Sequence, residues 1–284
     1  MPTSQPLIII GAARSGTKLL RDVIAAHPAV AKVPYDINYI WRMGNEGLAH
    51  DEIEPGMLTA SNREHIRAQF FAYAGDSHLL VEKTVSNCLR VPFVQAVLPE
   101  AQFIHLVRDG RDVIESVYRQ WTASPDWRYI WQKTRTFPLR YAFGYGMKYA
   151  VGLFKKSFSQ DKEHVTTWGP RYTGIDTDLI EKGVWETCAL QWLACVQSAL
   201  QGLSLVPTSK QICIRYEDFV QQPQIFLAQI AAFLNIDPQP YQSLSPEYNI
   251  TIDNIGKGVN RIPKDQLPLV MPHLEKGLAL LNYA

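Results

Sequence analysis

The chain has 284 residues, of which 46% are hydrophobic and 19% are charged. This composition is typical of a globular protein and excludes a disordered or low-complexity chain. The formal net charge is only +1, so no overall field attracts the protein to nucleic acid or to an acidic membrane. Any anion that the protein binds must therefore be held by local groups of charge.

The sequence contains no segment that we interpret as a secretory leader or a membrane span. The first apolar run covers only residues 7–10 and follows a start without basic residues, whereas a signal peptide needs a basic start and a longer apolar core. The aromatic-rich stretch 137–154 is interrupted by Arg140 and Lys148 and is short for a bilayer, which takes roughly 20 apolar residues.

Four cysteines are present, at positions 88, 188, 195 and 213, and no two of them form a C-x-x-C pair. A zinc or redox motif is therefore not indicated. Buried free thiols in a reducing compartment explain such isolated cysteines best. We expect a cytoplasmic protein.

The chain begins with a strand, a glycine-containing turn and a helix. Leu7–Ile10 is a short apolar run that ends at Gly11, which predicts a buried strand. From Thr17 onward, four apolar side chains share one helical face, and the His27-Pro28 pair ends this helix.

The same unit recurs along the chain. Further strands are predicted at 79–81, 103–107 and 212–214, and further helices at 110–118, 184–203 and 226–234. Strands that alternate with helices predict a three-layer α/β fold with a parallel sheet, which binds ligands at the carboxyl ends of its strands. No internal repeat or flexible linker interrupts the pattern, so we expect a single domain over residues 1–284.

The stretch from about residue 121 to 175 is less regular and rich in aromatic residues. They include Trp121, Trp127, Trp131, Tyr141, Tyr145 and Trp168. This composition fits a helical insertion that covers the site, and it also fits ordinary core and subunit contacts.

The first turn has the features of a phosphate-binding loop. Backbone N–H groups converge in a strand-to-helix turn, and the start of the helix adds partial positive charge. Ser15 and Thr17 offer hydroxyl donors, and the guanidinium group of Arg14 matches an oxyanion. A tight turn with a capping hydroxyl is the alternative interpretation.

This loop departs from the ATP-binding P-loop, G-x-x-x-x-G-K-[ST]. Gly11 and Gly16 have the required spacing, but Thr17 occupies the lysine position, and Lys18 stands where a hydroxyl residue would bind magnesium. The departure indicates a phosphate cradle that is used without magnesium-assisted phosphoryl transfer.

A second motif, Arg108-Asp-Gly-Arg-Asp-Val-Ile-Glu-Ser116, follows the strand at 103–107. Arg108 and Ser116 could clamp a second, separate phosphate from the strand end and the helix. Asp109 is suited to cap the helix, and Asp112 lies in its first turn. Anion sites on two strand–helix units fit a nucleotide that has phosphates at two positions.

Together these motifs resemble those of sulfotransferases that use 3'-phosphoadenosine 5'-phosphosulfate (PAPS). The family's 5'-phosphosulfate loop reads close to [KR]-S-G-T-[ST]-x-L, and its 3'-phosphate motif close to R-[DN]-x-[RK]-D-x-x-x-S; residues 14–20 and 108–116 match them. Segments 26–30 and 215–219 are also similar to family members that act on carbohydrates or protein tyrosines, as well as to bacterial members. The resemblance covers residues 7 to about 261.

The resemblance implies a P-loop NTPase-like parallel sheet flanked by helices, with PAPS as donor and 3'-phosphoadenosine 5'-phosphate (PAP) as product. The acceptor would be a carbohydrate or small molecule, with the 121–175 insertion on its side, and no metal is implied. The implied donor contacts are Arg14, Ser15, Gly16, Thr17, Lys18, Leu19, Arg108, Ser116, Lys257 and Arg261. Lys18 replaces the family's usual second hydroxyl, and the loop with Lys257 and Arg261 lacks the tryptophan that often follows it, so a solvated loop is the alternative there.

The resemblance also implies roles for three residues in the reaction. Arg14 would stabilise the leaving oxygen, and Lys83, in the sequence Glu-Lys-Thr, would contact the transferring sulfuryl group. An acceptor hydroxyl needs a general base, and Asp36 is the carboxylate nearest to the position that relatives use. Glu82 and His105 are the alternatives for the base, although a histidine inside an apolar strand is usually a core residue.

Two other functions compete with sulfate transfer. A P-loop kinase would need a lysine after Gly16 followed by a hydroxyl residue, and both are absent. A catalytically idle nucleotide-binding module is disfavoured by the joint presence of Arg14, Lys83, Arg108 and Ser116.

Overall fold

Five parallel strands form the centre of the computed structural model, which describes residues 4–123 and 168–283. They are β1 (Gln5–Ile10), β2 (Val30–Lys32), β3 (Leu79–Glu82), β4 (Gln102–Val107) and β5 (Gln211–Arg215). Their order is β2-β3-β1-β4-β5, so β1 lies between β3 and β4. The predicted parallel sheet is confirmed, and the carboxyl ends of these strands lie at one edge.

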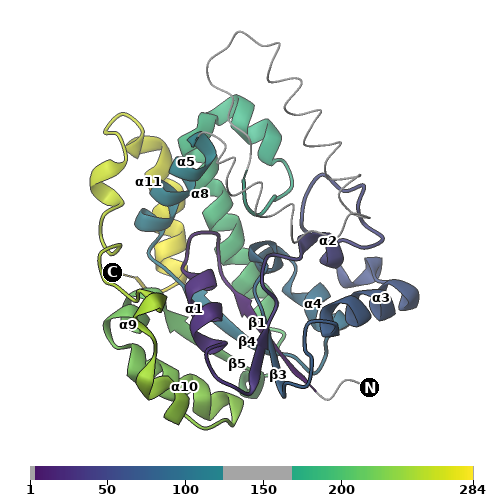
Figure 1. Ribbon diagram of the computed structural model, residues 1–284. Coiled ribbons are helices and arrows are strands. Elements are labelled where there is room, and N and C mark those ends of the chain that lie inside the picture. The colour runs from purple at the N-terminus through teal and green to yellow at the C-terminus, as the bar shows by residue number, and fades with distance from the viewer. Residues whose placement is uncertain (1–3, 124–167, 284) are drawn as a thin grey trace. The chain divides into compact units, whose positions relative to one another are not determined.

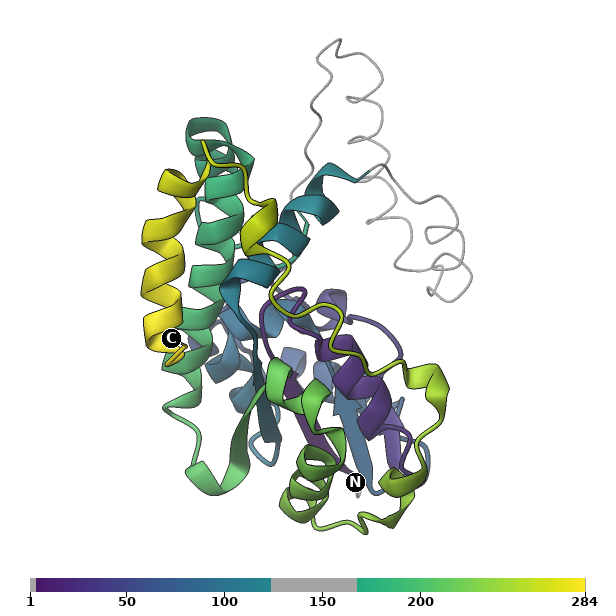
Figure 2. The ribbon, with the colours of Figure 1, turned by 90° about the vertical axis from the view of Figure 1, so that its left-hand side faces the viewer.

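Helices cover both faces of this sheet (Figures 1 and 2). The α-helices are α1 (Thr17–Ile24), α2 (Asn38–Trp41), α3 (Ala60–Phe71), α4 (Val91–Val97), α5 (Gly110–Thr122), α8 (Ile175–Leu203), α9 (Tyr216–Gln221), α10 (Pro223–Leu234) and α11 (Leu267–Leu280). The short 3-10 helices are η1 (Pro55–Met57), η2 (Val85–Leu89), η3 (Thr208–Lys210), η4 (Gln239–Ser243), η5 (Pro246–Tyr248) and η6 (Val259–Arg261). Figure 2 shows α1 and α10 on one side of the sheet and α8 with α11 on the other, which gives the expected three layers.

The strands are apolar on both faces because both faces are covered. Alternate residues of a strand point to opposite sides. Leu7, Ile9 and Val81 pack with α1, α9 and α10 in one core cluster, whereas Ile8 and Ile10, also fully buried, point to the other side. This double burial explains the continuous apolar runs in the sequence. Two polar residues, Glu82 and His105, break the pattern on the second side.

The predicted helix at 184–203 corresponds to the regular part of α8. α8 begins at Ile175 and consists of two helical segments that meet in a kink at Gly183, whose backbone is non-helical with φ 77°. The apolar helical pattern therefore begins after that residue. The predicted strand limits agree with β1, β3, β4 and β5 to within two residues.

Contacts divide the chain into two compact units, one made of residues 1–118 and 168–284 and the other of residues 119–167. Most of the expected 121–175 insertion lies outside the described residues, as do Trp127, Trp131, Tyr141 and Tyr145. The single domain stays a prediction. None of the described helices is both long and apolar enough to span a bilayer.

The four cysteines are free thiols. Three of them are buried as expected, but Cys213, on the edge strand β5, is exposed.

The ring of Trp192 on α8 lies between two glycines of neighbouring helices. A Cβ atom at Gly110 would lie 2.5 Å from a ring carbon, and one at Gly277 would lie 2.2 Å from the ring. Trp192 is only 2% exposed, so the ring cannot move aside. The absence of side chains at these two positions lets α5, α8 and α11 approach closely.

We predict that Gly277→Ala destabilises the protein. Alanine is normally better than glycine inside a helix by about 1 kcal/mol, but overpacking of a buried ring costs about 1–3 kcal/mol. The free energy of unfolding should therefore fall, measured as a lower urea midpoint. The control is Gly47→Ala, whose Cβ would meet nothing within 4 Å. A midpoint for Gly277→Ala at or above that of wild type would contradict the tight packing.

Candidate functional site

The turn between β1 and α1 has the backbone of an anion-binding loop. Arg14 and Gly16 both have left-handed conformations, with φ of 69° and 86°. A turn with such residues directs successive N–H groups into one concavity, and the start of α1 adds partial positive charge. Gly16 also has no space for a side chain, because a Cβ there would lie 2.4 Å from the ring of Tyr216.

The structure joins this turn directly to the second motif. The Nε of Arg14 donates to the Oγ of Ser116 at 2.9 Å. The Nη1 of Arg108 donates to the carbonyl oxygen of Arg14, also at 2.9 Å. The two predicted anion-binding turns therefore form one site at the carboxyl ends of β1 and β4.

Arg108 is a buried cation with an unused donor. Its guanidinium carbon lies 4.4 Å above the ring of Tyr216, and its Nη2 lies 3.7 Å from Asp112 and donates to the carbonyl oxygen of Asn254. Its Nε is buried and has no acceptor among the described residues. Buried donors are nearly always paired, so this atom indicates a place for an acceptor oxygen of a ligand.

Asp112 holds the loop that carries Lys257. Its two carboxylate oxygens accept the backbone N–H groups of Gly256 and Gly258 at 2.8 and 2.7 Å. Lys257, between them, is exposed, and Arg261 lies 3.5 Å from Glu115 of α5. Asp109 caps α5 as predicted, since its side chain accepts the N–H of Arg111.

The sequence pattern does not predict the long-range partners of Arg108. It places Asp112 in the first turn of the helix only and gives Tyr216 and Asn254 no part in the site. A positional signal existed for Asp112, because it is one of the fixed residues of the second motif, but its contact with the loop 144 residues away has no sequence signal.

The side chain of Lys18 is held away from the turn. Its amine donates to Asp22 at 2.9 Å, and the same carboxylate accepts from Lys32 and Arg21. Burial alone would raise the pKa of Asp22, but these hydrogen bonds lower it to about 2. Leu19 is partly buried against the core cluster. The contacts of Lys18 and Leu19 with a donor nucleotide stay predictions.

A lysine–carboxylate pair lies beyond β3 and β2. The amine of Lys83 contacts Asp36 Oδ1, and Asp36 Oδ2 accepts the N–H of Val85 at 3.4 Å. The Asp36 side chain is 33% exposed, whereas that of Lys83 is 10% exposed. The structure therefore brings together two residues that the sequence treats as separate candidates.

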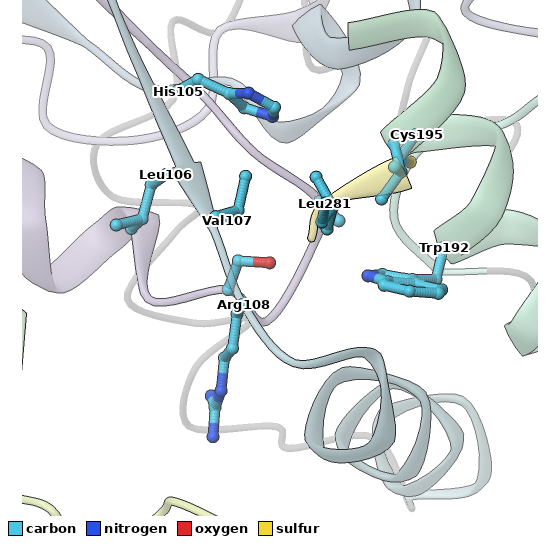
Figure 3. A pocket seen from close by; sticks show the side chains of 10 residues that line it. His105, Leu106, Val107, Arg108, Trp192, Cys195 and Leu281 are labelled. Carbon is cyan, nitrogen blue, oxygen red and sulfur yellow. The ribbon is translucent and has the colours of Figure 1, made fainter. Parts of the chain in front are cut away.

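The other two candidates for a base lie inside the protein. Burial raises the pKa of Glu82 to about 7, to which the charge of Asp36 contributes. Burial lowers the pKa of His105 to about 4. His105 lines a small cavity with Trp192 and Cys195, from which the Arg108 side chain points away (Figure 3). Of the three, Asp36 alone is accessible enough to meet an acceptor.

Within the described parts of the chain, no three His, Cys, Asp or Glu side chains come together as potential ligands of one metal ion. The site assembled there consists of cationic and hydroxyl side chains with backbone N–H groups. Such groups bind and polarise oxyanions.

The family model described as "Sulfotransferase family" matches residues 6–145. The fold is similar to the sulfotransferase domain from the curacin biosynthetic pathway, with 19% identity, coverage of 100% of this chain and 99% of that one, and a TM-score of 0.53. The sulfotransferase domain of the Synechococcus PCC 7002 olefin synthase is 18% identical, with coverage of 100% of this chain and 97% of that one and a TM-score of 0.53. The sulfotransferase from Alicyclobacillus acidocaldarius is 13% identical, with the same coverage of 100% and 97% and a TM-score of 0.51. No curated protein sequence matches the chain.

We predict that His105 makes stability depend on pH. Its pKa of about 4 lies below the ordinary 6.5, so the unfolded chain binds a proton in this window and the folded chain does not. Stability is therefore lost as the pH falls from 6.5 towards 4, by about 2 kcal/mol between pH 7 and pH 5. In urea unfolding, His105→Gln should lose less stability over that range than wild type. His65→Gln, at an exposed position, is the control, and equal pH slopes in all three proteins would contradict the prediction.

Proposed function

We propose that the chain is a sulfotransferase that transfers the sulfuryl group of PAPS to a hydroxyl or amine of a carbohydrate or small molecule, which the match of residues 6–145 to the sulfotransferase family model and the similar folds support. The observation that carries this proposal is the junction of the two anion-binding turns. Arg14 donates to Ser116, and Arg108 donates to the carbonyl oxygen of Arg14. One nucleotide with phosphates at its 5' and 3' positions fits two adjoining turns.

Each turn offers suitable groups to one end of that nucleotide. The 5' end would meet the backbone N–H groups between Arg14 and Thr17, whose convergence follows from the left-handed residues. The 3' phosphate would take the unused Nε of Arg108 and the hydroxyl of Ser116. Lys257 is exposed on the loop that Asp112 ties to α5, where it can add charge to the same phosphate.

The reaction needs a group that takes the proton of the acceptor and a cation that stabilises the leaving phosphate. A bond forms between the acceptor oxygen or nitrogen and sulfur while the bond between sulfur and the 5'-phosphate oxygen breaks. Asp36 takes the acceptor's proton, and Arg14 stabilises the negative charge that develops on the leaving phosphate. Lys83 holds Asp36 in position through their ion pair and presents its remaining N–H groups to the sulfuryl oxygens.

The low net charge of the chain favours an acceptor that itself carries little charge. A highly anionic polymer is bound by a broad basic surface, whereas this chain has a net charge of only +1. A carbohydrate or small molecule of low charge is therefore the better candidate.

We predict that PAP raises the melting temperature of the protein more than ATP, ADP or NAD does. At about 100 times its dissociation constant, a ligand of the folded state adds about 2.7 kcal/mol, which corresponds to a rise of about 5 °C. Arg108→Ala should lose most of this rise relative to its own unliganded melting temperature. Arg63→Ala, at an exposed position on α3, is the control. An equal rise with ATP, together with magnesium-dependent ATP turnover, would favour a kinase instead.

Asp36→Asn should lower kcat about 10²- to 10⁴-fold, because general-base catalysis contributes that much. The thermal shift with PAP should stay close to the wild-type value, since Asp36 lies outside the nucleotide turns. Sulfate transfer from PAPS to a panel of hydroxyl acceptors gives the rates, with Asp76→Asn, exposed before β3, as the control. Wild-type turnover in Asp36→Asn would remove Asp36 from the role of base.

A further inference from the structure

A buried carboxylate lies next to the Lys83–Asp36 pair and takes no part in the chemistry above. Glu82 is the last residue of β3 and is 0% exposed. It follows Val81, which faces the core cluster with α1, so the Glu82 side chain points to the opposite side of the sheet. A carboxylate in such a place is costly unless all its oxygens are bonded.

Both oxygens of Glu82 accept hydrogen bonds from buried side chains. Oε1 accepts from the hydroxyl of Thr84, and Oε2 accepts from the amide nitrogen of Asn87 at 3.1 Å. The amide oxygen of Asn87 in turn accepts from Nε of Arg90 at 3.0 Å, which fixes the orientation of the Asn87 amide. Thr84, Asn87 and Arg90 are each at most 1% exposed.

Thr84 extends this bonding to the segment that carries Asp36. Its hydroxyl donates to Glu82 and accepts the backbone N–H of Ile37 at 2.9 Å, a combination that a single hydroxyl group can satisfy. Ile37 follows Asp36 directly in the chain. Lys83 and the N–H of Val85 contact the Asp36 carboxylate itself.

We propose that Glu82 is a positioning residue for the Lys83–Asp36 pair and that it acts through Thr84. Glu82 fixes the Thr84 hydroxyl, and Thr84 fixes the backbone beside Asp36. In the Glu-Lys-Thr sequence, Glu82 is therefore the buried anchor and Lys83 is the partner of Asp36. Thr84 is the link to the backbone of Ile37. This inference rests on the proposed function, because it concerns the residue assigned as the base.

The experiment compares steady-state sulfate transfer by wild type, Thr84→Val, Thr84→Ser, Glu82→Gln and the double variant Glu82→Gln/Thr84→Val. Valine has a similar shape to threonine but lacks the link, so kcat should fall about tenfold or more, because small displacements of reacting groups are costly. The KM for PAPS and the thermal shift with PAP should stay unchanged. Thr84→Ser keeps the hydroxyl group and should retain kcat within about threefold of wild type.

Glu82→Gln keeps the volume of the side chain, but its amide nitrogen is a donor and would face either Thr84 or Asn87. Both of these residues already donate a hydrogen bond to position 82. The kcat of this variant should therefore also fall. The double variant should be no slower than the slower single variant, because residues that act in one chain of bonds are not additive. Glu64→Gln, exposed on α3, is the control for the substitution and should behave as wild type.

An unchanged kcat in Thr84→Val and Glu82→Gln, with an active wild-type chain, would overturn the positioning role and leave the proposed function intact. Losses that multiply in the double variant, or a parallel loss of the thermal shift with PAP, would overturn it as well. If Glu82→Gln fails to fold, the comparison of Thr84→Val with Thr84→Ser decides, because both keep the carboxylate. A wild-type chain that transfers no sulfate to any acceptor would overturn the proposed function and this inference with it.

Discussion

The hydrogen bond from Arg108 to the carbonyl oxygen of Arg14 is the contact on which the site depends. It joins the turns that follow β1 and β4, which are neighbours in the sheet. Arg14 adopts a left-handed conformation with φ 69°, which costs an ordinary residue about 1–2 kcal/mol. A hydrogen bond from a charged donor contributes about 1.5–3 kcal/mol, so the bond to Arg108 can offset the strain.

Asp112 then determines how much charge Arg108 keeps for a ligand. The carboxylate lies 3.7 Å from the guanidinium group, which partly neutralises it. The same carboxylate accepts the N–H groups of Gly256 and Gly258, and these bonds draw its charge toward the loop. The cation therefore stays buried without full neutralisation, which is a suitable state for a group that binds an oxyanion. Asp112 therefore links the position of the loop to the charge of Arg108.

Short, local sequence patterns predict those parts of the fold and the site that depend on neighbouring residues in the chain. Apolar runs that end in glycine or arginine identified β1 and β4, and parallel pairing placed Arg14 and Arg108 at the same edge. β2 has only three residues and shows no period, and α11 contains Pro272 within its span, so neither was predicted. The contact of Lys18 with Asp22 has the helical i,i+4 spacing and could have been found. The burial of Glu82 could not, because it depends on packing from η2, which no sequence pattern indicates.

The strand order explains why the two halves of the site have different chemical character. β1 and β4 end in the turns with Arg14 and Arg108, which bind through cations and backbone N–H groups. β2 and β3 lead to Asp36 and Lys83, the carboxylate that we propose as the base and its lysine partner. β3 pairs with both β1 and β2, so Lys83 follows the strand that lies between the strand leading to Arg14 and the strand leading to Asp36. In the proposed reaction, a cation at this junction attracts the sulfuryl oxygens of the donor as well as the carboxylate of Asp36. Its own placement must then be rigid, and a buried network below it provides that rigidity where a solvent-exposed one would not.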